Sequence, residues 1–208
     1  MGHLFPLPHR SHLQDLLTTS SGQQRLLQSL RDRLLDSFPD RSTIDAFADD
    51  AELIRILRWC SDRICTVKEL VDDPDLNFVW RKPRLDFGYE VVAASLSKSG
   101  VPSADAVKLV EDVKTVIQRN QDLTKLNGEI KKLTKGSDSV LPFKDLMGLT
   151  RWCLTGSSEG PPVFEVIDIV GKEKAVERLD LATEFLKERA RLNESIGNRS
   201  EHLEHRQS

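Results

Sequence analysis

The sequence predicts an all-α protein, and three observations support this prediction. Apolar residues recur at helical spacing along most of the 208-residue chain, as at Leu27, Leu30 and Leu34. Prolines and glycines stand where helices begin or end, for example Pro39 and Gly156. No segment alternates apolar and polar residues for long enough to form a sheet.

The first half of the chain is expected to form helices joined by short breaks. One helix ends at Pro39, and the next two are separated by a break near Ser61 and Asp62. An aromatic turn follows over residues 71–83, and its Phe78 and Trp80 are expected to pack on the helices rather than stack on a base. The expected helices cover residues 26–38, 53–57 and 64–70.

The second half continues the helical pattern. The segment SLSKSG (95–100) ends one helix, and Ser103 is expected to cap the next. The buried stripe of that helix is predicted to contain Val107, Val110, Val113 and Ile117. Further helices are expected at 126–136, 141–156, 160–171 and 172–190, with Gly136 and Gly156 at C′ positions and Val176, Leu179, Phe185 and Leu186 facing inward.

Several classes of function are excluded by composition and by missing motifs. The formal net charge of −3 gives no overall attraction to nucleic acid, so a basic site would have to be local. The three cysteines form neither a disulfide framework nor a zinc pattern. No apolar run approaches the ~18–20 residues of a membrane span. The histidines lie near the two ends, and no P-loop, GxGxxG or GxSxG is present, so we expect no catalytic residues, no cofactor and no membrane partner.

A local basic region stands in the C-terminal third. Six cations precede or adjoin the glycine- and proline-rich segment TGSSEGPPVFE (155–165). Exposed backbone groups on a stiff loop beside cations could read unpaired bases and hold phosphates. The residues equally fit a plain helix–helix connection with solvated lysines, so both interpretations stay open at this point. The cations are Lys125, Lys131, Lys132, Lys135, Lys144 and Arg151.

The same region carries a resemblance to a known family. The segments LNGEIKKLTKG (126–136) and LMGLTRWCLTGSSEGPPVFEVIDIVGKEKAVERL (146–179) resemble the end of glutamyl-tRNA synthetases, class I enzymes, of the bacterial and mitochondrial type. Upstream, residues 51–83 are similar to the helical cage of that family, and the likeness covers most of residues 4–185. The residues that match the family pattern are Arg151, Leu154, Thr155, Gly156, Gly160, Pro161, Glu165, Gly171, Glu173, Arg178 and Leu179.

The resemblance implies an all-α, two-part helical cage and bundle that binds the anticodon of tRNA-Glu. It implies a cage subdomain over 1–85, a terminal anticodon-contacting subdomain over 86–190 and a polar, disordered tail over 191–208. Arg151 matches an arginine that contacts an anticodon base, and Gly160, Pro161 and Val163 match the loop that cradles the bases. Arg63 matches a cage position where arginine favours glutamate-type anticodons. Lys131 and Lys132 are expected to attract phosphates.

The catalytic half of the family is not found in this sequence. SLSKSG resembles the KMSKS loop that binds ATP phosphates, but it follows the cage, whereas the family's loop precedes it, so Lys98 is predicted to be a loop lysine. ATP and Mg²⁺ would belong to the absent half, supplied by a separate catalytic chain if one exists. The chain would then be a fragment, a partial product or a split subunit. The alternative is a helical protein-interaction scaffold. The resemblance implies the mitochondrial matrix, with the cytoplasm as the alternative.

Overall fold

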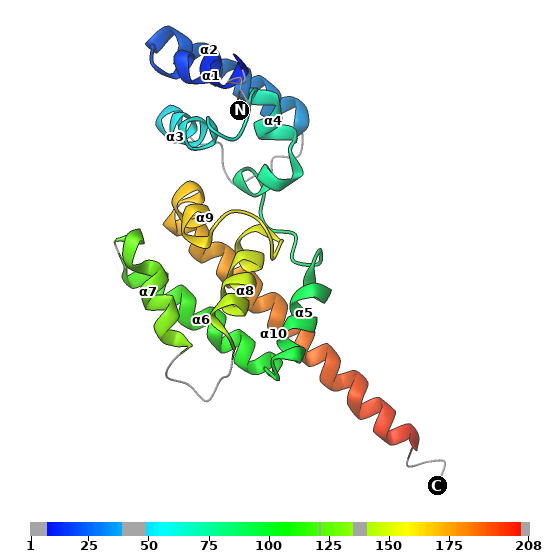
Figure 1. The fold of residues 1–208 in the computed structure, drawn as a ribbon. Helices are drawn as coiled ribbons and strands as arrows, with labels where there is room; N and C mark the ends of the chain where they lie inside the picture. Colours follow the sequence, from blue (N-terminus) through cyan, green and yellow to red (C-terminus); the bar gives the residue numbers. More distant parts are fainter. Residues whose placement is uncertain (1–7, 39–48, 121, 135–140, 205–208) are drawn as a thin grey trace, which may run out of the picture. The chain divides into compact units, whose positions relative to one another are not determined.

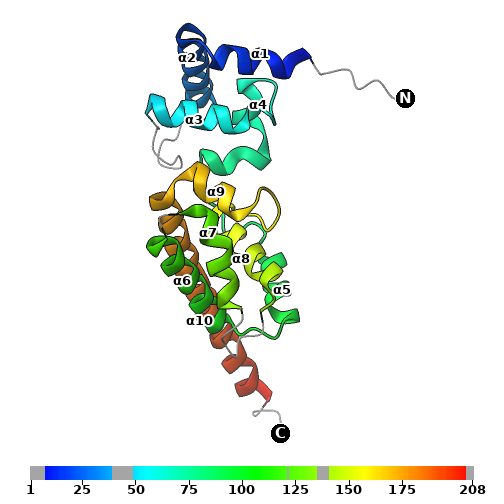
Figure 2. The ribbon, with the colours of Figure 1, turned by 60° about the vertical axis from the view of Figure 1, so that its left-hand side comes forward.

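The computed structural model describes residues 8–38, 49–120, 122–134 and 141–204. Within these ranges the regular elements are all helices and no strand is found, which confirms the predicted fold class. The chain divides into two compact units, Met1–Lys82 and Pro83–Ser208, whereas the sequence led us to expect a division at residue 85. The ribbon is drawn in two views (Figures 1 and 2).

The first unit is built around the second helix. Thr19 caps it, because its hydroxyl accepts a hydrogen bond from the Gly22 amide at 3.1 Å. Trp80 and Phe78 are both buried, and the indole N–H of Trp80 donates to the Leu70 carbonyl at 2.8 Å, so the predicted packing of this aromatic turn is confirmed. The elements are α1 (Pro8–Leu17), α2 (Ser20–Ser37), α3 (Asp50–Cys60), α4 (Val67–Asp72) and the 3₁₀ helix η2 (Pro74–Val79).

The second unit is assembled around a long last helix. This helix, α10, packs against α6, α8 and α9, and α8 also packs against α5 (Figures 1 and 2). The core of the unit contains the fully buried Trp152, Ile167 and Leu179. The helices are α5 (Tyr89–Lys98), α6 (Ser103–Arg119), α7 (Leu123–Leu133), α8 (Phe143–Thr155), α9 (Val163–Val170) and α10 (Lys172–Glu204).

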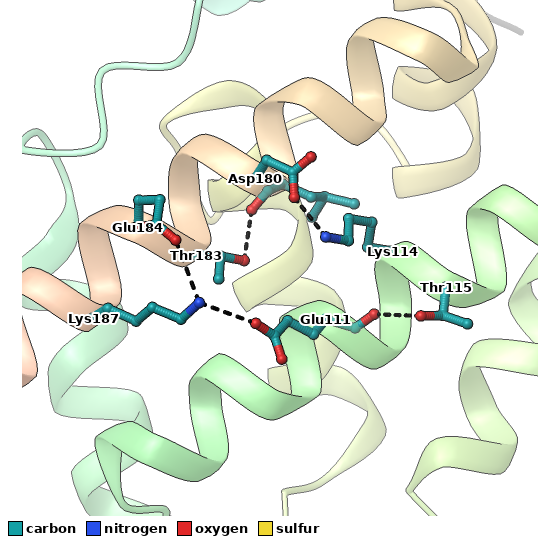
Figure 3. Close-up of polar contacts among 8 residues, drawn as sticks. Glu111, Lys114, Thr115, Asp180, Thr183, Glu184 and Lys187 are labelled. Atoms are coloured by element: carbon teal, nitrogen blue, oxygen red, sulfur yellow. Dashed lines mark hydrogen bonds and ion pairs between the residues drawn. The ribbon is translucent and has the colours of Figure 1, made fainter.

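Ion pairs link the outer faces of α6 and α10 (Figure 3). The Lys114 ammonium lies 2.6 Å from the Asp180 carboxylate, and Lys187 lies 3.2 Å from Glu111 and 3.3 Å from Glu184. Hydrogen bonds to Glu111 and Glu184 raise the pKa of Lys187. Because these pairs are solvent-exposed, they orient the two helices more than they stabilise the unit.

The start of α6 differs from the sequence prediction. Ser103 is the first helical residue rather than the cap, and the N-cap is Pro102, whose side chain makes no capping hydrogen bond. The ring of Pro102 already sets a φ of −61°, which brings the chain into the helix without a side-chain cap. The buried stripe contains Ala106 and Leu109, whereas Val107 is only half-buried.

The end of the chain also differs from the prediction. The backbone of α10 stays helical to Glu204, although a disordered tail was expected from residue 191. The segment 188–195 is rich in Glu, Arg, Ala and Leu, which favour helix, so the polar sequence extends a helix that is already nucleated. On α10 itself, Leu179 and Leu186 are buried as predicted, while Val176 and Phe185 are half-buried.

Three smaller predictions concern single residues. Lys98 is the exposed last residue of α5 rather than part of a loop. Cys60 and Cys153 are free and buried, and burial raises the pKa of the Cys60 thiol to about 12. The C′ position predicted for Gly136 lies outside the described residues.

Candidate nucleic-acid interface

The connection from α8 to α9, residues 156–162, begins at a glycine that no other residue could replace without strain. Gly156 has a φ of +82°, in the left-handed region that favours glycine. A Cβ added there would lie 3.1 Å from both the backbone nitrogen and the backbone oxygen of Arg84. The predicted C′ role of Gly156 is therefore confirmed, and the glycine also permits close contact with the segment before α5.

Arg151 holds the middle of the connection. Its Nε donates to the Pro161 carbonyl at 2.8 Å, and its Nη1 donates to the Ser158 carbonyl at 2.7 Å. Burial lowers the pKa of this guanidinium from its ordinary value. Arg151, which the family resemblance assigns to contact with an anticodon base, thus also fixes the conformation of the exposed loop.

Short-range hydrogen bonds complete the loop. The Ser157 amide donates to the Thr155 hydroxyl at 3.1 Å, and the Glu159 amide donates to the Ser157 hydroxyl at 3.1 Å. Gly160 follows with a φ of +124° and is exposed. With its turn fixed in this way, the loop exposes residues 157, 159 and 160, and at Gly160 the exposed group is the backbone itself.

A second arginine supports the helix turn from which the loop begins. Arg178 on α10 is 1% exposed, and its Nη1 donates to the Leu154 carbonyl in the last turn of α8 at 2.8 Å. Burial lowers the pKa of Arg178 to about 10. The sequence pattern matched this residue to the family but gave it no role. Its burial could not be read from the sequence, because arginine is rarely buried and no partner is close in the chain.

A groove lies beside the loop, between α5 and α8. It encloses a cavity of about 250 Å³ that is lined on the α5 side by Val91 and Ser95 and on the α8 side by Lys144 and Arg151. Ser158 and Glu159 of the loop close one end. Asp145 and Glu159 supply two carboxylates against the two cations, so the groove is not uniformly basic, and most of its remaining lining is apolar.

The structure separates the lysines that the sequence grouped together. On α7, Lys132 pairs with Glu129 at 2.5 Å and Lys131 lies 6.0 Å from the ring centre of Phe143. Lys125 pairs with Asp122 at 3.5 Å. Lys144 instead shares the groove with Arg151, and Lys135 lies outside the described residues.

Two other predicted site residues are placed differently from the exposed loop. Val163 is the first residue of α9 and is fully buried. Arg63 belongs to the first compact unit, is exposed, and stacks its guanidinium over the Trp59 ring at 4.3 Å. It therefore comes from a different unit than Arg151, Gly160 and Pro161.

The described part of the chain contains neither a metal-binding cluster nor a membrane-crossing helix. No group of three or more His, Cys, Asp or Glu side chains in it is arranged to hold a metal ion. None of its helices combines the length and the apolar character that crossing a membrane requires.

Comparisons with known proteins place these features in context. A family model described as an anticodon binding domain matches residues 23–183. The fold is similar to that of a glutamate tRNA ligase from Elizabethkingia meningosepticum, with a TM-score of 0.58 and 20% identity over 84% of this chain and 31% of that one. A glutamate-tRNA synthetase from Elizabethkingia anophelis gives a TM-score of 0.56 and 20% identity over 83% and 30%. At this identity the likeness concerns the fold, and the chain spans about a third of the length of each structure.

Proposed function

This chain belongs to the family of anticodon-binding domains, and from that premise we propose that it binds the anticodon stem-loop of tRNA-Glu. In this proposal it serves as the RNA-binding part of a glutamyl-tRNA synthetase during translation. The likeness in fold to two glutamate-tRNA ligases supports the choice of amino acid, together with the family pattern around Arg151.

One observation carries the proposal, namely the prearranged loop 156–162. Its exposed residues include Gly160, which has no side chain to keep a base away from the backbone. Arg151 crosses beneath the loop with two nitrogens bound to carbonyls, and its Nη2 has no partner within the described ranges. Backbone groups and a guanidinium nitrogen in one place are suited to hydrogen-bonding the edge of an unstacked base.

The proposal assigns amino-acid activation to a catalytic half that binds ATP and Mg²⁺. We propose that this half lies outside residues 1–208 and that this chain contributes affinity and anticodon choice. The resemblance to mitochondrial and bacterial enzymes leads us to propose the mitochondrial matrix as the compartment, which imaging of a tagged chain would test.

Filter binding to tRNA-Glu, tRNA-Gln and an unrelated RNA hairpin across a salt series tests the proposal. We expect the purified chain to prefer tRNA-Glu, and the affinity to fall with rising salt because phosphate contacts release counterions. Arg151→Ala should lose about 1–3 kcal/mol of preference, by analogy with arginine contacts to base edges.

Two variants separate a specific role of Arg151 from loss of charge. Arg151→Lys keeps the charge but cannot bond both carbonyls in the same way, so it should also lose preference. Arg119→Ala removes an exposed arginine at the end of α6 and should bind as the unmodified chain does. If the chain binds neither tRNA better than the hairpin, the proposal is wrong and a protein-interaction scaffold becomes the better description.

A further inference from the structure

We propose that Phe87 and Val91 form a stacking platform for an unpaired nucleotide base next to the bases held by the loop 156–162. The inference rests on the proposed function and adds a second contact surface to it. Val91 lines the α5 side of the groove, whose opposite wall carries Lys144 and Arg151, and Phe87 lies in the segment just before α5.

The ring of Phe87 is exposed although its backbone is fixed. The residue is 73% exposed. Its amide donates to the Arg84 carbonyl at 3.1 Å, and its carbonyl accepts a hydrogen bond from the indole N–H of the buried Trp152 at 3.3 Å. The backbone that carries the ring is thus fixed, which lowers the entropy that binding would otherwise remove.

Phe87 stands where it could pack on a residue of α5, but it does not do so fully. Gly88 is the N-cap of α5, so Phe87 and Val92 occupy the N′ and N4 positions, where apolar side chains often pack on each other as a hydrophobic staple. Val92 is buried, but a ring that is 73% exposed cannot be covering it fully. The large apolar surface of Phe87 is therefore left for an external partner.

Val91, in the first turn of α5, supplies apolar surface within the groove. It is 61% exposed and lines the groove, whose opposite wall contains Arg151 and Ser158. Gly88, next to Phe87 in the chain, lies close to the loop, since a Cβ added there would be 3.2 Å from the Gly156 carbonyl oxygen. A base stacked on Phe87 would therefore adjoin a base held at the loop 156–162. This continuity favours successive nucleotides of one strand as the occupant.

Lys144 supplies the charge that a nucleotide needs. It is exposed, lines the groove, and has no carboxylate at ion-pair distance in the described part of the chain. Of the two carboxylates nearby, Asp145 accepts a hydrogen bond from the Ser99 hydroxyl at 3.4 Å, and Glu159 is exposed. An aromatic face for the base beside a free ammonium for the phosphate is the arrangement used for single-stranded RNA.

A protein partner fits this surface less well. A stable protein interface buries roughly 800 Å² on each partner and has an apolar centre. Phe87 and Val91 are two exposed apolar side chains beside a groove that also carries four charged side chains, which suits one nucleotide better than the apolar centre of a protein interface.

The test uses a tRNA-Glu anticodon stem-loop with 2-aminopurine placed next to the anticodon. We expect binding to quench its fluorescence, because the base stacks on Phe87. Phe87→Leu should bind about tenfold more weakly and lose the quenching, since leucine keeps the apolar character but not the aromatic face. Phe87→Trp should restore both. Lys144→Gln should weaken binding and reduce the salt dependence by about one phosphate contact.

Control variants change other exposed residues of the unit, away from the groove. Leu192→Ala on α10 and Lys108→Gln on α6 should leave binding and quenching unchanged. If the stem-loop binds but Phe87→Leu shows the same affinity and quenching as the unmodified chain, the proposed platform is wrong. The surface would then be open to a protein partner, and the proposed function would still stand. If the unmodified chain does not bind the stem-loop at all, both proposals fail.

Discussion

The connection between α3 and α4 (residues 61–66) and the connection between α8 and α9 (residues 156–162) both turn the chain from one helix into the next. The first is closed mainly by its neighbours in sequence, with one exposed long-range hydrogen bond from the Gln14 side-chain amide to the Asp62 carboxylate at 2.6 Å. The Glu69 amide donates to the Thr66 hydroxyl at 3.3 Å, and the Glu69 carboxylate accepts from the Cys65 amide at 2.9 Å. This is close to a capping box, in which side chain and backbone cap each other within one turn.

The second connection adds, to its own short-range hydrogen bonds, contacts with residues that are distant in the sequence. Arg178 reaches the Leu154 carbonyl from 24 residues away, and the Arg84 backbone lies against Gly156. The conformation of this loop therefore depends in part on how α10 and the segment before α5 pack, whereas the first connection depends mainly on one helix turn. We infer that damage to the first stays local and that damage to the second spreads through its unit.

The largest expected effect comes from removing the arginine that supports the second connection. Arg178→Ala removes a buried side chain together with the donor to the Leu154 carbonyl, and we expect the free energy of unfolding to fall by about 3 kcal/mol. The variant also removes the cost of burying the guanidinium charge, and this gain offsets part of the lost stability. Urea unfolding measures it. Arg191→Ala, an exposed change on the same helix, should stay within about 0.5 kcal/mol, and a similar value for both variants would refute the idea.

A smaller effect tests the close contact at the start of the same loop. Gly156→Ala should lower the free energy of unfolding by about 2–3 kcal/mol, because it combines a left-handed backbone with contact against Arg84. Gly100→Ala is the matched control, since Gly100 has a φ of +68° and a Cβ added there would meet no atom within 4 Å. We expect about 1 kcal/mol there. Equal losses in thermal unfolding would mean that the contact with Arg84 contributes nothing.

The first connection should respond less and more locally. Thr66→Ala removes the cap of α4 and should lower the free energy of unfolding by about 1 kcal/mol. Thr66→Ser keeps the hydroxyl and should be nearly neutral. Amide hydrogen exchange should accelerate only near residues 66–72. Faster exchange throughout the first unit would show that this connection is not local after all.

The smallest effect concerns the surface between α6 and α10. Replacing Lys114 by Met breaks its pair with Asp180, and we expect a change of about 0.5 kcal/mol or less, because the pair is exposed to solvent. A double-mutant cycle with Asp180→Asn isolates the pair, and added salt should shrink the interaction energy further. An interaction energy above about 2 kcal/mol would show that these ion pairs rather than the core fix the two helices.

The fold was readable from the sequence where its causes were local. Helical spacing predicted α2, α8 and α9, and Pro39 and Gly156 marked helix ends because proline and glycine act on their own backbone. The start of α6 was misjudged because Pro102 sets the chain direction without a side-chain cap. The tail was misjudged because a polar segment continues a helix whose beginning is buried in the core.

The candidate site was readable only in part. The family pattern identified Arg151, Gly160 and Pro161, which lie together in the second unit. It could not show that Arg151 bonds the loop carbonyls, nor that Val163 is buried, since both depend on how the loop folds back on α8. The groove and the exposed ring of Phe87 depend on the packing of α5 on α8, which no spacing in the sequence encodes.

The hydrogen bonds of Arg151 have a kinetic consequence for any ligand of the loop. Because Nε and Nη1 already hold the Pro161 and Ser158 carbonyls, the loop does not have to find its shape during an encounter. Association would then be limited by diffusion and by electrostatic attraction rather than by a rearrangement of the protein. Differences between ligands would appear mainly in how quickly each one leaves.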